Sequence, residues 1–375
     1  MDAATTLYTS ERIAAVRAST AAAGIDALVI TPGAELRYLT GYDAHASERL
    51  TALVVPAEGP ATLIVPRLER PLAASSPLPG TGVGIVDFGD GVNPYALLAS
   101  FLDEHVGSGR RVIGAAERMW ASHWHGIEAA VPSASLAMAA TVLSPLRMVK
   151  SAAEVAELTR AAEAIDRVHT RMGEWLRPGR TEREVAADIK AAIVEEGHTA
   201  VSFAIVAAGP NGASPHHGVS DAVIESGQPV VVDIGGVVDT GYGSDCTRTY
   251  CVGQTPADFN DYYGALRAAH QAGVDAVRPG VTASSVDAAT RAVLTDAGYG
   301  EFFTHRTGHG IGLDGHEAPY IVDGDDTVLA PGMAFSIEPG VYIPGRHGAR
   351  IEDIVVCTET GVTRLDTLPT EVTIL

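Results

Sequence analysis

The sequence predicts a two-domain protein of the α/β class whose second domain is an internally duplicated α+β unit. Its 375 residues are enough for two hydrophobic cores, and 46% hydrophobic against 19% charged residues is ordinary globular composition. Helical and strand patterns alternate through the first 142 residues. Beyond them, the stretch 177–197 recurs at 278–298, which is the main evidence for the duplication.

The first domain is predicted to span residues 1–142 and the second residues 143–375, with LSPLRMVKS at 143–151 as the linker. Short apolar runs bounded by turn residues predict strands, and amphipathic stretches predict helices. The helices are expected over 11–23, about 94–106 and 122–131, and the strands over 27–30, 51–56, 61–66 and 110–115.

Two capping boxes mark helix starts in the second domain. Ser151 with Glu154 begins a long helix that is expected to stop at Arg177-Pro178-Gly179. Thr181 with Glu184 begins a second helix that is expected to end at Gly197.

The duplication is visible in two pairs of segments. RPGRTEREVAADIKAAIVEEG (177–197) matches RPGVTASSVDAATRAVLTDAG (278–298), and GQPVVVD (227–233) parallels GMAFSIE (332–338). Both pairs come in the same order along the chain, so they predict two copies of one unit related by a pseudo-twofold axis.

Charge and cysteine content exclude several functional classes. The formal net charge of −20 argues against nucleic acid as a partner, because phosphate binding needs basic patches. The sequence contains neither an apolar run of the ~20 residues that span a membrane nor a basic segment followed by an apolar core at its start. All three cysteines lie in predicted strands, and we expect them to be reduced thiols in the core. They are Cys246, Cys251 and Cys357. We therefore expect a soluble cytoplasmic protein.

Two aspartates follow the strand pattern in the first copy. Asp233 closes the apolar run of VVVDIGG, and an Asp at the end of a buried strand is costly unless it is paired or bound to a cation. Asp245 opens SDCTRTY, where the alternation of strand residues places it on one face with Thr247 and Thr249. A hairpin would bring Asp233 and Asp245 together.

The second copy contributes histidines and glutamates. THRTGHGIGLDGHEAPY places His305, His309 and His316 in a glycine-rich, non-helical segment. It contains no HExxH motif, so a helical zinc-protease site is excluded. In FSIEPG and RIEDIV, Glu338 and Glu352 lie in predicted strands, with Glu352 facing inward and Asp353 at the surface or behind it. SPHHGVSD adds His216 and His217, which also suit a plain surface loop.

Four of these candidate site residues are carboxylates: Asp233, Asp245, Glu338 and Glu352. Four carboxylates in one site repel one another unless cations neutralise them. Four carboxylates and one imidazole suit a pair of divalent metal ions, an arrangement used for hydrolysis.

With these motifs, the chain resembles the M24 metallopeptidases, the pita-bread family of methionine aminopeptidase, aminopeptidase P and prolidase. The resemblance implies that two divalent cations activate water for attack on a peptide carbonyl. It implies that Glu338 also shuttles a proton, that His216 and His316 stabilise the tetrahedral intermediate, and that His305 shapes a proline pocket. The metal ligands that it implies are Asp233, Asp245, His309, Glu338 and Glu352.

The resemblance also indicates a branch of the family. RYLTGY (37–42) is similar to the creatinase/prolidase N-terminal domain, and the compact length resembles short bacterial Xaa-Pro dipeptidases. The alternatives are an Xaa-Pro aminopeptidase on longer peptides, a hydrolase of another C–N bond, or a non-catalytic pita-bread binding protein. VDGDDTV occupies the stretch where longer prolidases carry an arginine, so Arg350 and Arg346 are the candidates for binding the substrate carboxylate.

The resemblance implies two ions per chain, of which Mn²⁺ is favoured by the oxygen-rich ligands, with Co²⁺, Zn²⁺ and Fe²⁺ as alternatives. It also implies a small peptide substrate and a homodimer, with no nucleic acid and no membrane as partners.

Overall fold

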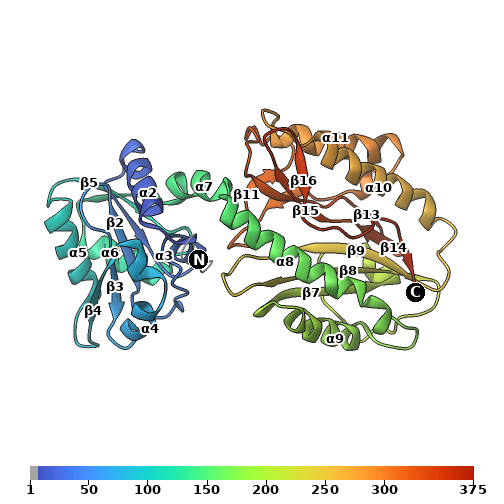
Figure 1. The fold of residues 1–375 in the computed structure, drawn as a ribbon, viewed down its shortest axis with the longest axis horizontal. Helices are drawn as coiled ribbons and strands as arrows, with labels where there is room; N and C mark the ends of the chain where they lie inside the picture. Colours follow the sequence, from blue (N-terminus) through green and yellow to red (C-terminus); the bar gives the residue numbers. More distant parts are fainter. Residues whose placement is uncertain (1–6) are drawn as a thin grey trace. The chain divides into compact units, whose positions relative to one another are not determined.

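The computed structural model describes residues 7–375 and divides the chain into two compact units, one ending at Arg147 and the other Met148–Leu375 (Figure 1). The division falls within the segment predicted to be a linker. Much of that segment is helical, because α7 (Ala140–Met148) continues through residues 143–148. Across residues 7–375, no helix combines the length and apolar character needed to cross a membrane.

The first unit is built on one mixed sheet of six strands in the order β4-β3-β2-β1-β5-β6. The strands and helices predicted in this unit are confirmed to within two residues at each end. Strands β4 and β6 have no counterpart among the elements predicted from the sequence; they lie at the sheet edges and are only partly buried. The strands are β1 (Ala27–Ile30), β2 (Ala52–Pro56), β3 (Thr62–Pro66), β4 (Gly84–Phe88), β5 (Arg111–Ala115) and β6 (Ala134–Met138). The helices are α2 (Ser10–Ala22), α3 (Ala34–Thr40), α4 (Arg70–Ser75), α5 (Pro94–His105), α6 (Ala121–Ala130) and α7.

Four long helices cover the second unit: α8 (Ala152–Thr170), α9 (Glu182–Glu195), α10 (Phe259–Ala276) and α11 (Ala283–Asp296). Both predicted capping boxes are confirmed at the starts of α8 and α9. The predicted end of the first helix is wrong, because α8 stops at Thr170. The chain then makes a 3-10 turn (Met172–Glu174) that packs Met172, Trp175 and Leu176 into the core.

The second unit contains two sheets and a separate hairpin. The first sheet has the order β17-β9-β8-β7, and the second has the order β11-β10-β12-β15-β16. Figure 1 shows α9 on one side of these sheets and α10 with α11 on the opposite side. The first sheet comprises β7 (Ala200–Ala208), β8 (Gln228–Val237), β9 (Cys246–Val252) and β17 (Thr373–Ile374). The second comprises β10 (Gly308–Gly310), β11 (Glu317–Ile321), β12 (Ala334–Ile337), β15 (Asp353–Cys357) and β16 (Val362–Arg364). The hairpin pairs β13 (Gly340–Ile343) with β14 (His347–Arg350).

The backbone of the second unit confirms the predicted duplication. Equivalent hydrogen bonds tie the start of α9 and the start of α11 to the loop that precedes the central strand of each sheet. The pairs are Gly179 N to Ile224 O and Gly280 N to Leu329 O, then Glu182 N to Ala222 O and Ala283 N to Thr327 O.

Strand register shows which site residues are equivalent in the two copies. Val232 pairs with Arg248 in β8–β9, and Ile337 pairs with Asp353 in β12–β15. Asp233 and Glu338, one residue further on, are therefore equivalent, and the counterpart of Glu352 is Thr247. Thr247 and Glu352 themselves form a β-bridge, so the two copies meet at this point. The duplication explains one pair of carboxylates, whereas Asp245 and Glu352 break the symmetry.

Candidate metal centre

A cavity of about 620 Å³ opens in the second unit. Its walls combine carboxylates, histidines and two arginines with three apolar residues. The lining residues are Phe203, Ile205, Pro215, His216, Asp233, Asp245, His305, Arg306, His309, His316, Glu338, Arg350 and Glu352.

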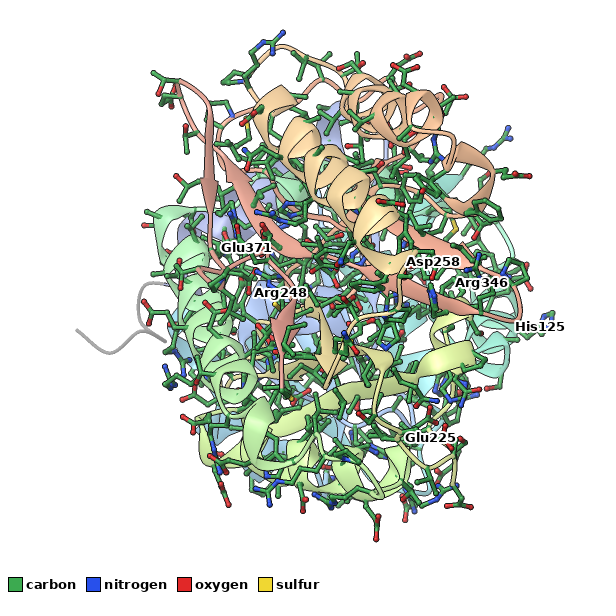
Figure 2. All side chains as sticks on the ribbon, turned by 90° about the vertical axis from the view of Figure 1, so that its right-hand side faces the viewer. His125, Glu225, Arg248, Asp258, Arg346 and Glu371 are labelled. Atoms are coloured by element: carbon green, nitrogen blue, oxygen red, sulfur yellow. The ribbon has the colours of Figure 1, made fainter. Side chains whose placement is uncertain are left out.

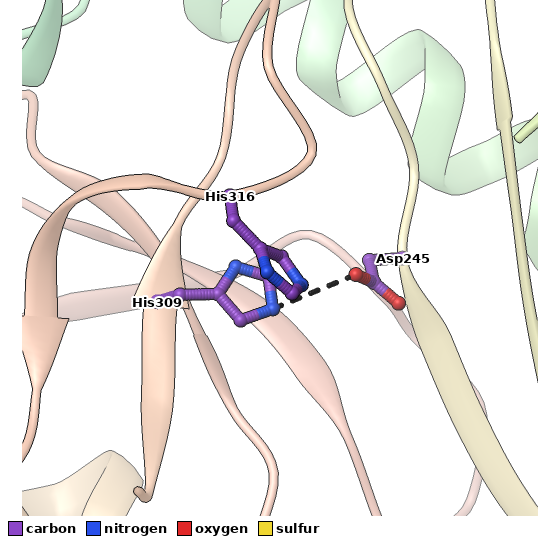
Figure 3. Close-up of side chains that lie close together, drawn as sticks. All are labelled: Asp245, His309 and His316. Atoms are coloured by element: carbon purple, nitrogen blue, oxygen red, sulfur yellow. Dashed lines mark ion pairs between the residues drawn. The ribbon is translucent and has the colours of Figure 1, made fainter. Parts of the chain in front are cut away.

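The five predicted metal ligands converge in this cavity. They form overlapping clusters in which the nearest ligand atoms lie within 4.8 Å of one another. The clusters are Asp233 with Asp245 and Glu352, His309 with Glu338 and Glu352, and Asp245 with His309 and His316. Figure 3 shows the last of these, with His309 directed at Asp245 and the ring of His316 close to that of His309, tilted by 46°. Residues scattered over 120 positions in the sequence therefore meet at one point.

Close backbone contacts hold the ligand positions. His309 N donates to Ser336 Oγ at 3.0 Å, Glu338 N donates to Thr307 O at 2.7 Å, and Glu352 N donates to Thr247 O at 3.1 Å. A Cβ atom on Gly308 would lie 1.8 Å from Ser336 O, so only glycine fits there. The glycine of the TGHG motif thus lets β10 approach β12 closely enough to present His309.

The imidazole of His309 has a defined tautomer. Nδ1 lies 3.1 Å from Gly310 O, and because a carbonyl can only accept, Nδ1 carries the proton. Nε2 is then an unprotonated ligand atom, 3.4 Å from Glu338 Oε1 and 3.7 Å from Asp245 Oδ2. Burial and the neighbouring His316 lower the pKa of His309 to about 3, which keeps the ring neutral.

The carboxylates have the electrostatics of a site that needs cations. Burial, followed by repulsion from neighbouring carboxylates, raises the pKa values of Asp245 and Glu352 well above their usual range. Burial raises the pKa of Glu338 to about 7. Asp233 Oδ1 is buried without a hydrogen-bond partner. Both observations fit divalent cations bound among these oxygens, because cations would neutralise the charge and satisfy the orphaned atom.

The folded state of the metal-free protein is expected to become less stable as the pH rises from about 4.5 through about 7. Over this interval Glu338 retains a proton in the folded state that the unfolded state has released, so its contribution is fully present only at lower pH. Asp245 and Glu352 act in the same direction. Thermal unfolding in EDTA and in saturating Mn²⁺, at about pH 5 and about pH 8, measures the effect. Mn²⁺ should raise Tm more at the higher pH, and an equal shift would contradict this account.

Arg350 provides a positive charge from the chain itself next to the buried carboxylates. Its side chain lies beneath the carboxylates with only 3% of the residue exposed. Its Nη2 donates to Asp233 Oδ2 at 2.6 Å, its Nε to Thr247 Oγ1 at 3.2 Å and its Nη1 to Tyr342 Oη at 2.8 Å. Thr247 Oγ1 in turn donates to Glu352 at 2.7 Å. Arg350 thus orients two of the predicted ligands, and each of its nitrogens already has a partner.

His305 completes this network at the cavity wall. Its Nδ1 lies 2.7 Å from the carbonyl of Arg306 and therefore carries the proton, which leaves Nε2 to accept from Tyr342 Oη at 2.8 Å. Burial and the charge of Arg350 lower the pKa of His305 to about 4, in agreement with a neutral ring. Tyr342 links His305 to Arg350, a role that no motif in the sequence indicates.

The structure separates the two arginines predicted to bind the substrate carboxylate. Arg346 does not line the cavity. It lies in the β13–β14 turn with 55% of its side chain exposed and pairs with Asp258, as Figure 2 shows. Arg306 does line the cavity, with its guanidinium 4.7 Å from the ring centre of Tyr320 and an Nη2 3.3 Å from His316 Nδ1. The sequence signal that could have identified Arg306 as a cavity residue is its position three residues before His309, a predicted ligand.

The site and the fold together define a class of protein. The duplicated α+β domain has the architecture of the pita-bread fold, and a cavity that gathers carboxylates and histidines within it is typical of metal-dependent hydrolases. The model of metallopeptidase family M24 matches residues 156–359, and that of the creatinase/prolidase N-terminal domain matches residues 12–149. The chain belongs to metallopeptidase family M24.

Several named proteins are similar over nearly the whole chain. Probable dipeptidase PepE of Mycobacterium tuberculosis is 50% identical over 366 residues, covering 98% of this chain and 96% of that protein. An Xaa-Pro dipeptidase of Lactobacillus delbrueckii subsp. lactis is 35% identical, covering 90% of this chain and 92% of that protein. The crystal structure of dipeptidase PepE from Mycobacterium ulcerans superposes with a TM-score of 0.93 at 52% identity, covering 100% of this chain and 99% of that one.

Proposed function

We propose that the chain is an Xaa-Pro dipeptidase that depends on two divalent cations. The observation that carries the proposal is the convergence of the five ligand-type side chains in one cavity large enough for a dipeptide. The ligands are Asp233, Asp245, His309, Glu338 and Glu352. The similarity to proteins named dipeptidase and Xaa-Pro dipeptidase supports the choice of substrate.

Divalent cations bound at such a site supply Lewis acidity, which makes water a competent nucleophile near neutral pH. The chain's own residues do the rest. Glu338 lies at the cavity wall, where its carboxylate can take a proton from water and pass it to the leaving prolyl nitrogen. His216 and His316 line the same cavity, and we assign to them the stabilisation of the developing oxyanion and the leaving group.

Proline selectivity comes from shape. A prolyl amide has no N–H, so the site cannot select its substrate through that donor. Phe203, Ile205 and Pro215 provide an apolar part of the wall, and His305 is held in one orientation beside it by Tyr342. An apolar wall together with an imidazole held in one orientation suits the apolar pyrrolidine ring.

Metal identity and assembly complete the proposal. Oxygen-rich ligation with a neutral imidazole favours Mn²⁺, with Co²⁺, Zn²⁺ and Fe²⁺ as alternatives. Cys246, Cys251 and Cys357 are all buried free thiols, which suits a reducing cytoplasm. By resemblance to its family we propose a homodimer, which sedimentation equilibrium would test.

A hydrolysis panel tests the function directly. Ala-Pro, Ala-Ala, Ala-Pro-Ala and Ala-Ala-Ala would be incubated with EDTA-treated protein after addition of Mn²⁺, Co²⁺, Zn²⁺ or Fe²⁺. The proposal requires metal-dependent cleavage of Ala-Pro in preference to Ala-Ala. Cleavage that persists in EDTA, or no preference for proline, would refute it.

One observation favours a second candidate, an Xaa-Pro aminopeptidase acting on longer peptides. A more open groove of about 650 Å³ runs along α11 and shares His305 and Arg306 with the metal-site cavity. Such a groove could receive residues that follow the proline. Ala-Pro-Ala cleaved faster than Ala-Pro would select this candidate.

Arg306 is expected to bind the carboxylate of a dipeptide substrate, because Arg350 is committed to protein partners and Arg346 lies elsewhere. A charge-assisted hydrogen bond contributes about 1.5–3 kcal/mol, so Arg306→Ala should lower kcat/KM for Ala-Pro about 10–100-fold. Ala-Pro-amide, which lacks the carboxylate, should lose little. Arg346→Ala serves as the matched control and should resemble wild type. An equal loss on both substrates would assign Arg306 another role.

A further inference from the structure

The cavity wall that carries Pro215 and His216 is a loop, residues 209–220, between β7 and β8. Donors from this loop and from Ala208, the last residue of β7, converge on Glu182, the first residue of α9, which is 0% exposed. Five donors point at this one carboxylate. They are Ala208 N (2.9 Å) and Asn211 Nδ2 (2.9 Å) on Oε1, and His217 Nε2 (2.8 Å), Ser220 N (3.0 Å) and Ser220 Oγ (2.7 Å) on Oε2.

The carboxylate of Glu182 is held ionised despite its burial. Burial alone would raise its pKa, but the hydrogen bonds from Ala208, Asn211, Ser220 and His217 lower it below the usual value. The N-terminal end of α9 also favours a negative charge at this position. A buried charge with this many donors tolerates little displacement of its partners, so the loop is anchored at both of its ends.

The adjacent histidines His216 and His217 lie in different surroundings. His217 directs Nε2 at Glu182, whereas His216, one residue earlier, lines the cavity. The loop also packs against the strand that carries Arg350, since a Cβ on Gly348 would lie 2.1 Å from Gly212 O. The position of His216 relative to the carboxylates is thus set by Glu182 on one side and by β14 on the other.

We infer that Glu182 is a positioning residue for His216 and acts on the reaction only through it. The inference rests on the proposed function, because it takes His216 as a group that stabilises the transition state. It predicts a loss of kcat, with KM and metal content little changed, when Glu182 is altered.

A double-mutant cycle tests the inference on whichever peptide of the panel is cleaved fastest. His216→Ala should lower kcat about 10²–10³-fold with two metal ions per chain retained. Glu182→Gln keeps the size of the side chain but replaces one acceptor oxygen with a donor, so it should lower kcat about 10²-fold. In the His216→Ala background, Glu182→Gln should cost less than about threefold more.

Glu184→Gln is the matched control. Glu184 lies two residues away, is exposed and serves only the capping box with Thr181. Its replacement should lower Tm slightly and leave kcat unchanged. Ser220→Ala removes one donor to Glu182, together with the acceptor of Ala222 N, and provides a milder variant should Glu182→Gln fold poorly. It should show the same dependence on His216.

Three outcomes would overturn the inference. Losses that multiply in the double variants, or a fall in metal content in Glu182→Gln, would show that Glu182 supports the whole domain. Unchanged kcat in His216→Ala would remove the group through which Glu182 is said to act. That last result would leave the proposed function intact if metal-dependent cleavage of Ala-Pro persisted.

Discussion

Asp245→Asn is expected to release metal and to abolish most hydrolysis. Asp245 belongs to two of the ligand clusters, and the amide that replaces it is neutral and a weaker ligand for hard cations. Loss of a hydrogen-bond partner of a ligand typically costs about 10–100-fold in metal affinity or activity, so loss of a ligand should exceed that. Elemental analysis after gel filtration, together with the rate of Ala-Pro cleavage, measures both effects.

The Asn variant is chosen because its shape matches that of Asp, so packing at this buried position is conserved. Asp221→Asn is the matched control, since Asp221 is an exposed carboxylate paired with Arg183. It should retain wild-type metal content and rate. Two ions per chain with full activity in Asp245→Asn would show that the proposed ligand set is wrong.

Arg350→Met is expected to cause the largest loss of stability. The guanidinium donates to Asp233, Thr247 and Tyr342, and it is the nearest permanent cation to the buried carboxylates. Removing one partner of a buried ion pair typically costs about 3–5 kcal/mol, because the other charge is left uncompensated. Urea unfolding in EDTA near pH 7 should show a loss of this size.

Two comparisons distinguish the effect of the positive charge of Arg350 from the effect of its hydrogen-bond geometry. Saturating Mn²⁺ should recover part of the loss in Arg350→Met, since bound cations would compensate the same carboxylates. Arg350→Lys keeps the charge but cannot reach three acceptors with a planar fork, so its loss should be intermediate. A loss below about 1 kcal/mol in Arg350→Met, or a Lys variant as unstable as the Met variant, would contradict this account.

Local sequence signals predicted the parts of the fold that depend on near neighbours. The capping boxes at Ser151 and Thr181 form as expected, because each satisfies backbone donors within one turn of helix. The Arg-Pro-Gly motif predicts a later end for α8 than the structure shows. Burial of Trp175 and Leu176 in the core turns the chain earlier, and that depends on residues far away in the sequence.

Contacts between distant residues explain the other differences. Of the two positions expected for Asp353, the one at the surface is wrong, because the residue is 0% exposed and pairs with Arg248 and Arg364. Its partner Arg248 lies 105 residues away, at the equivalent position of the other copy. Pairing across the pseudo-twofold axis has no periodic signature in either copy alone, so the strand pattern could not reveal it.

By itself the sequence determined the duplication and the five ligand-type residues, because recurring segments and short motifs are local patterns. The tertiary structure decided which other polar side chains lie next to those five residues. It placed Arg350 among the carboxylates, Arg306 at the cavity wall and Arg346 outside it, and it directed the loop of His216 onto Glu182. Those choices follow from burial and hydrogen bonding between segments far apart in the chain, where a charge is tolerated only if its partners arrive from several elements at once.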